Sequence, residues 1–157
     1  MSTLYRVGGI APTRFVVAVQ SLVWLATSEG VCPSSEIASQ VQAHATFLRR
    51  IMSPLVQAGI VASREGRVGG YALARPADRI TLGEVYAVVR AASADAGEEG
   101  GESSCGPQAE LLDAVLKDIL EQAEERVVEF LNRITIADLV ARVTRLRQNA
   151  TQGSTCG

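Results

Sequence analysis

The sequence predicts a mainly α-helical fold with one small β-hairpin, and three observations support this prediction. Of the 157 residues, 47% are hydrophobic but only 4% are aromatic, so Ala, Val, Leu and Ile must build the core, which favours helices over a β-sandwich. Apolar residues recur at steps of three and four along most of the chain, as on one face of a helix. Two short alternating runs on either side of a glycine-rich stretch are typical of a hairpin.

Three helices are expected ahead of the hairpin. Residues 12–28 form an amphipathic segment, and the Pro and Ser before residue 35 suit the start of a short helix over 35–42. A third helix is predicted over 45–58, where Gly59 provides a natural C-terminal cap. Pro54 lies inside this helix and lacks a backbone donor, so we expect the last turn to be bent or loosened.

The hairpin is predicted from residues 60–64 and 71–74, which alternate on either side of the loop 65–70. Three of the six loop residues are glycines. Because glycine adopts positive φ without a steric penalty, we expect the tip to take such angles and to lie close against another surface.

A capping box opens the second half of the chain. In it the hydroxyl of Thr81 and the carboxylate of Glu84 would satisfy the first donors of a helix that runs to about Ala92. Residues 93–107 are rich in Gly, Ser and acidic residues, and we expect them to be flexible. One long helix follows over 108–134. Its apolar residues form the seam expected of a dimer interface, namely Leu112, Leu116, Ile119, Ala123, Val127 and Phe130.

A second capping signal, Thr135 with Asp138, predicts a last helix to about Leu146. The order of helix, helix, turn, helix and two-stranded wing is that of a winged helix-turn-helix. The predicted organisation is a winged helix-turn-helix DNA-binding domain over 1–92, a flexible sensor-type loop over 93–107, dimerisation helices over 108–147 and a mobile tail over 148–157.

Charge is divided unequally along the chain. Residues 1–83 carry eight arginines and four acidic residues, a net charge of +4, whereas the remaining residues carry −6. A basic segment joined to an acidic one suggests that the first half meets a polyanion and the second does not. An ordinary solvated surface explains the charges alone equally well.

Double-stranded DNA is the partner that this arrangement favours. A helix about 12 Å across fits the major groove, and a basic glycine-rich hairpin can lie along phosphates or the neighbouring minor groove. Arginine pairs bidentately with guanine or with phosphate, so each arginine of the third helix or the wing could position the protein or specify a base. The candidate DNA-binding residues are Thr46, Arg49, Arg50, Arg64, Arg67, Gly69, Gly70 and Tyr71.

Two other classes of function are a protein-docking module and an enzyme. Winged helices also serve as protein-docking modules, and the discriminating feature is whether Arg49, Arg50 and Arg67 form one exposed basic face. An enzyme has little support, because the chain has one histidine, no nucleophile motif, no phosphate loop followed by a helix and no metal-ligand spacing.

Four stretches then carry a resemblance to one known family. They are FLRRI at 47–51, LVQAGIV at 55–61, RVGGYALARP at 67–76 and ITLGEV at 80–85. These stretches resemble the Rrf-type winged helix-turn-helix regulators, the IscR/NsrR/CymR superfamily, over residues 15–89. The resemblance implies a homodimeric transcription factor, usually a repressor, that binds a palindromic operator. It also implies that the third helix enters the major groove, the wing touches the minor groove and the long helix pairs with its mate.

The resemblance raises the question of the signal that is sensed. Cluster-binding members carry three cysteines between the post-wing helix and the dimer helix, whereas this chain has only Cys105 there. A [2Fe–2S] cluster needs about four thiolate or imidazole ligands, so we expect no cofactor and no metal site, and a cluster only through unusual ligands or a shared dimer site.

Cys105 itself has three interpretations. It could be a redox-active thiol, although acidic neighbours would raise its pKa and slow its reaction; it could have no role; or it could belong to a site for a small molecule or metal. A protein partner or small effector could then replace the thiol as the signal.

Four glutamates of the long helix suggest a carboxylate metal site. We expect them instead to form a solvated face, with Arg126 and Arg133 as i+4 or interchain partners. The glutamates are Glu121, Glu124, Glu125 and Glu129.

The sequence predicts a cytoplasmic protein without a membrane partner. The longest apolar run, residues 15–26, contains Gln20 and Ser21 and is too short to span a bilayer. Three widely spaced cysteines fit no disulfide framework and indicate a reducing compartment.

Overall fold

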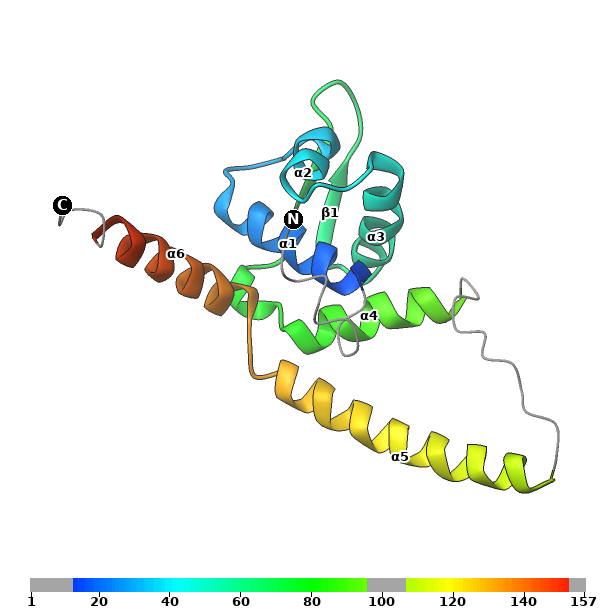
Figure 1. The fold of residues 1–157 in the computed structure, drawn as a ribbon. Helices are drawn as coiled ribbons and strands as arrows, with labels where there is room; N and C mark the ends of the chain where they lie inside the picture. The colour runs from blue at the N-terminus through cyan, green and yellow to red at the C-terminus, as the bar shows by residue number, and fades with distance from the viewer. Residues whose placement is uncertain (1–12, 96–106, 153–157) are drawn as a thin grey trace.

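A computed structural model describes residues 13–95 and 107–152 and confirms the mainly α-helical fold with a hairpin wing (Figure 1). No helix in these two ranges is long and apolar enough to cross a membrane. The elements are α1 (Thr13–Thr27), α2 (Ser34–Gln40), α3 (Ala45–Gln57), β1 (Val61–Arg64), β2 (Gly70–Leu73), the 3₁₀ helix η2 (Ala77–Arg79), α4 (Leu82–Asp95), α5 (Pro107–Leu131) and α6 (Ile136–Gln152).

Helices α2 and α3 form the helix-turn-helix. The turn between them is tight enough to place Gln42 at φ 53°, a conformation that few residues other than glycine adopt. Helix α3 continues through Pro54 to Gln57, and the Pro54 carbonyl still accepts a bond of 2.9 Å from the Ala58 N–H. Gly59 follows at φ 70°, which confirms it as the residue that ends the helix.

Strands β1 and β2 are antiparallel, with Val61 opposite Leu73 and Arg64 opposite Gly70. The prediction that the loop glycines take positive φ was right only for Gly66, at φ 109°. At Gly69 and Gly70 the reason for glycine is instead that a Cβ atom would clash with neighbouring backbone. A Cβ on Gly70 would lie 2.5 Å from the carbonyl carbon of Cys32 and closer still to its oxygen. The hairpin base therefore lies directly on the backbone before α2.

One hydrophobic core contains buried side chains from α1, α2, α3, the hairpin and α4. Ile136, the first residue of α6, is also fully buried in it. Close packing of this kind fixes the helices relative to one another, since small shifts would open cavities. The largest fully buried apolar side chains are Leu22, Ile37, Leu48, Met52, Leu55, Ile60, Ile80 and Ile136.

Only half of the predicted capping box at α4 forms. The Glu84 N–H donates to the Thr81 hydroxyl oxygen at 3.2 Å, as expected, but the Glu84 carboxylate pairs with Arg75 at 2.6 Å. The Glu84 carboxylate was expected to accept a hydrogen bond from a backbone N–H at the start of α4. It pairs with Arg75 instead, because a hydrogen bond to a charged guanidinium is stronger than one to a backbone N–H. Helix α4 also runs three residues beyond Ala92, to Asp95.

The two C-terminal helices differ from the prediction at their ends. Helix α5 ends at Leu131, and α6 continues to Gln152, so the start of the predicted mobile tail is helical. Thr135 and Asp138 form the expected cap: the Thr135 N–H and hydroxyl each donate to the Asp138 carboxylate at 2.9 Å. Both bonds stabilise the charged carboxylate and so lower the pKa of Asp138; the bond from the Thr135 N–H has the larger effect and the bond from its hydroxyl the smaller.

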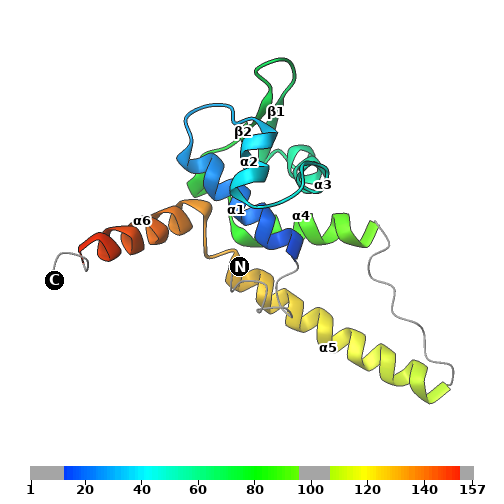
Figure 2. The same cartoon turned by 45° about the horizontal axis from the view of Figure 1, so that its top comes forward.

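The long helix stands apart from the winged domain. Helix α5 runs along α4 at the end of the molecule opposite the hairpin loop. The start of α6 contacts α1, and the rest of α6 projects away from the domain (Figure 2). The connection between α5 and α6 is held to the domain by backbone bonds of 2.8 Å from Leu82 to Ile134 and 2.9 Å from Ile136 to Ile80. This arrangement separates a compact domain from an extended helical arm.

We expect Gly70→Ala to lower the free energy of unfolding by about 1–3 kcal/mol, because the added methyl group has only backbone to displace. Urea unfolding followed by circular dichroism measures the change. Val68→Ala is the control: its side chain in the same loop is 83% exposed, so its effect should stay within about 0.5 kcal/mol. Equal unfolding midpoints for Gly70→Ala and the natural chain would contradict the close approach.

Candidate nucleic-acid interface

Helix α3 presents an apolar face to the core and a polar face to solvent. Its buried side chains include Leu48 and Ile51. Thr46, Arg49 and Arg50 are all exposed, and their spacing of three and four residues places them on one side of the helix. The structure therefore brings the three predicted α3 residues together on a surface that a groove of DNA could receive.

The wing residues fall into two groups. Arg64 and Arg67 are exposed, whereas Gly69, Gly70 and Tyr71 are half-buried. The N–H of Gly69 donates to Gly66 at 3.0 Å. Tyr71 exchanges two backbone bonds with Cys32, of 2.8 and 2.9 Å, and its side chain packs against the core. Gly69 and Tyr71 thus shape the wing through internal contacts, and their N–H groups are already bonded.

Four exposed arginines therefore belong to two neighbouring elements of the helix-turn-helix and wing. The hairpin loop projects at the end of the domain remote from α5, and the two views agree on this (Figures 1 and 2). Guanidinium groups there can pair with phosphate oxygens or with the O6 and N7 of guanine. The arginines are Arg49, Arg50, Arg64 and Arg67.

The predicted seam of α5 is largely exposed in the single chain. Leu112, Leu116, Ile119 and Phe130 are 58%, 44%, 53% and 62% exposed. Ala123 is also exposed, and Val127 is half-buried. A row of large apolar side chains in water is characteristic of a surface that another molecule covers. The face is broader than the seam, because Leu111, Val115 and Leu120 are exposed beside it.

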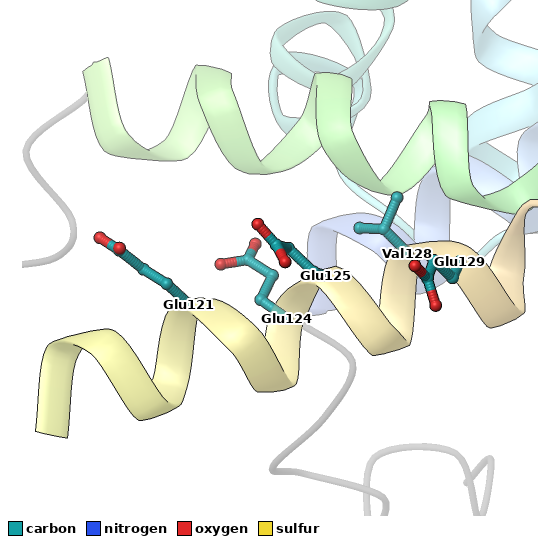
Figure 3. A pocket seen from close by; sticks show the side chains of 5 residues that line it. All are labelled: Glu121, Glu124, Glu125, Val128 and Glu129. Atoms are coloured by element: carbon teal, nitrogen blue, oxygen red, sulfur yellow. The ribbon is translucent and has the colours of Figure 1, made fainter.

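A groove on the other side of α5 is acidic. It is lined by Glu121, Glu124, Glu125, Val128 and Glu129, of which several point toward α4 (Figure 3). Glu124 pairs with Arg90 of α4 at 2.6 Å, a partner on another helix that was not predicted from the sequence. Arg126 lies 3.8 Å from Glu129. Negative charge would repel DNA from this groove.

The cysteines do not assemble a metal site in the part of the chain that is described. No group of three or more His, Cys, Asp or Glu suited to a metal ion occurs there. Cys32 is 5% exposed and lies beneath the wing. The sensor candidate Cys105, like Cys156, falls outside the described residues.

Comparison with known proteins places this geometry in a family. The family described as "Rrf2: Iron-dependent Transcriptional regulator" matches residues 11–142. The chain belongs to the Rrf2 family of transcriptional regulators. It is 34% identical over 128 residues to the HTH-type transcriptional regulator IscR of Erwinia tasmaniensis, covering 81% of this chain and 74% of that one. The IscR of Serratia proteamaculans gives the same identity, over 81% and 75%.

Solved structures of Rrf2 relatives share the fold. T. potens IscR superposes with a TM-score of 0.61 at 25% identity and covers 97% of this chain and 96% of that one. CymR (YrzC), the global cysteine regulator of B. subtilis, gives 0.59 at 25% identity over 84% and 96%. This Rrf2 protein is accordingly a winged-helix transcriptional regulator and not an enzyme.

Sequence reasoning missed the polar contacts that hold this Rrf2 protein's interface in place. Arg75 was assigned no role, yet its guanidinium contacts Glu84, and its Nε–H donates to the Gly59 carbonyl at 3.2 Å. Gly83 was considered only as part of a capping box. A glycine in the first turn of a helix is a signal of close backbone approach, and it could have drawn attention to this position.

Proposed function

We propose that this protein is a homodimeric repressor that binds a palindromic DNA operator. The observation that carries the proposal is the separation of two surfaces on one chain. Exposed arginines of α3 and the wing lie on the winged domain, and the exposed apolar face of α5 lies on the helical arm. The arginine surface can bind a polyanion, and the apolar face of α5 can pack against the same helix of a second chain.

The DNA contact would follow the usual docking of this motif. Helix α3 would lie in the major groove with Arg49 and Arg50 toward base edges and Thr46 within reach of a base or phosphate. Arg64 and Arg67 would bind phosphates or the adjacent minor groove. Gly69, Gly70 and Tyr71 would contribute by fixing the shape of the wing.

Dimerisation through α5 would present two copies of α3 to one face of the duplex. Dimers of helix-turn-helix proteins bind half-sites about one helical turn, 34–36 Å, apart or at multiples of it. A repressor of this design acts by occupying the promoter, so the affinity of the dimer for its operator sets the level of control.

A redox signal received by Cys105 is the second part of the proposal. Cys32 is 5% exposed and is poorly placed to react, so Cys105 and Cys156 are the remaining candidates for thiol chemistry. Within residues 13–95 and 107–152, no group of ligands suited to an iron–sulfur cluster occurs.

We expect binding to DNA to weaken steeply with salt and to depend on Arg49. Duplexes selected from a random pool by the full chain provide the probe, and titration at several salt concentrations gives the slope. Arg49→Ala should cost about 1–3 kcal/mol and relax the preference at one base pair. Arg145→Ala removes an equal charge from an exposed position on α6 and serves as the control. Binding that is undetectable or independent of salt would contradict the proposed function.

We expect Ile119→Asp to convert the dimer to monomers, because it places a charge at the centre of the apolar face. A penalty of about 3 kcal/mol weakens the dimer by about a hundredfold, which sedimentation velocity can measure over a dilution series. Ala114→Asp adds the same charge at an exposed position on the opposite side of α5 and should leave the dimer intact. A chain that is monomeric before substitution would contradict dimerisation through α5.

We expect mild oxidation to abolish operator binding by the natural chain and to leave Cys105→Ser unaffected, because the thiolate is the species that reacts. Counting free thiols before and after oxidation identifies how many react, and Cys32→Ser is the control for a buried thiol. Loss of binding in both the natural chain and Cys105→Ser would contradict the role of Cys105. Operator binding that is indifferent to oxidation would point to a small molecule or protein partner. Visible absorbance with bound iron after anaerobic purification would point to a cluster.

A further inference from the structure

We propose that a chain of contacts centred on Gly83 and Arg75 sets the position of α3 relative to α5, and so determines the half-site spacing that the dimer accepts. This inference rests on the proposed function, since spacing has meaning only for a dimer on a palindrome. The residues concerned lie between the two surfaces described above and hydrogen bond to one another and to the backbone of the same chain. They are therefore positioning residues.

The first link joins α5 to the start of α4. A Cβ on Gly83 would lie 2.9 Å from the backbone nitrogen of Asn132, just after α5, and closer still to its side-chain oxygen. Gly83 is buried, so a larger residue could not turn outward to avoid Asn132. Backbone bonds between residues 80–82 and 134–136 hold the same junction from the other side. The end of α5 thus lies at a fixed distance from the first turn of α4.

The second link runs along the start of α4. The Thr81 hydroxyl donates to the Asn132 side-chain oxygen at 3.1 Å and accepts from the Glu84 N–H at 3.2 Å. The Glu84 carboxylate then pairs with Arg75 at 2.6 Å. Because Thr81 bonds to Asn132 on one side and to the Glu84 N–H on the other, a movement at Asn132 changes the geometry available to Arg75.

The third link reaches the recognition helix. Arg75 donates from Nε to the carbonyl of Gly59, the residue that ends the turn after α3, at 3.2 Å. It also donates from Nη1 to the Arg79 carbonyl at 3.4 Å. Only a guanidinium has donors arranged to serve Gly59, Arg79 and Glu84 at once; a lysine ammonium is a single point. Arg75 therefore holds the end of α3 against the start of α4.

An independent contact holds the other end of α4. Arg90 pairs with Glu124 of α5 at 2.6 Å, about two turns beyond Glu84. Helix α4 thus contacts the α5 end at Gly83 and α5 again at Arg90. Arg75 links the start of α4 to the residue that follows α3. In a dimer paired through α5, a shift at the Gly83 junction would occur in both protomers and change the distance between the two copies of α3. Successive base pairs rise by about 3.4 Å and rotate by about 35°, so loosening this junction would let the two copies of α3 meet neighbouring spacings with less difference in affinity.

The test is a set of duplexes in which the spacing between the selected half-sites is changed by one or two base pairs in either direction. The natural chain should prefer one spacing by about tenfold over its neighbours. Gly83→Ala should reduce this preference to about threefold or less, and Arg75→Lys should do the same with charge retained. Dimer mass and the salt dependence of binding should not change, because neither surface is altered.

Two control variants test whether any substitution in this region changes the preferred spacing. Ala87→Ser adds one atom at an exposed position on α4, and Arg79→Lys is the same exchange as Arg75→Lys at an exposed side chain. Both should retain the natural preference. If Gly83→Ala does not fold, Glu84→Gln tests the same series of contacts by removing the charge that holds Arg75.

The outcomes separate the two proposals. A natural chain that binds no selected duplex, or binds without a preferred spacing, overturns the proposed function. A natural chain with a clear preference, together with folded variants that keep that preference and lose only thermal stability, overturns this inference and leaves the proposed function standing. A changed preference in Gly83→Ala and Arg75→Lys, with both controls unchanged, supports the inference.

Discussion

The position of the wing depends on a place where two stretches of backbone lie against each other with no room for a side chain between them. Gly70 sits on the peptide between Cys32 and Pro33, and Tyr71 and Cys32 exchange two backbone hydrogen bonds beside it. Buried N–H and C=O groups have to be paired, so this contact can form in one arrangement only. Because α2 begins immediately after Pro33, the same contact fixes the wing relative to the helix-turn-helix.

A second close approach of this kind occurs at Gly83, where the end of α5 meets the start of α4. The two contacts have opposite consequences for the shape of the molecule. The first closes the winged domain on itself, whereas the second joins that domain to a long helix that leaves it. The polar series from Asn132 to Gly59 connects the two regions through hydrogen bonds of Thr81, Glu84 and Arg75.

Charge and apolar surface are distributed to match these two regions. Four exposed arginines belong to α3 and the wing, and others, such as Arg145, lie on α6. Helix α5 carries seven acidic residues and two basic ones, as well as the exposed apolar face. One of those acids, Glu124, is used internally to hold Arg90. The acidic arm therefore discourages contact between α5 and a polyanion, and its apolar residues remain available to another helix. Membership of the Rrf2 family agrees with a molecule divided in this way.

Periodicity and turn chemistry in the sequence were sufficient to predict the helices, the polar face of α3 and the seam of α5, because these features depend on residues three or four positions apart. The hairpin was predicted from two-residue alternation on either side of a glycine-rich loop. The roles of Gly70, Gly83, Arg75 and Glu84 were decided only by the tertiary structure. Glu84 has the spacing of a capping residue, and nothing local shows that a guanidinium nine residues earlier competes for its carboxylate. A glycine likewise reveals whether it serves a turn or a close approach only when the distant backbone that faces it is known.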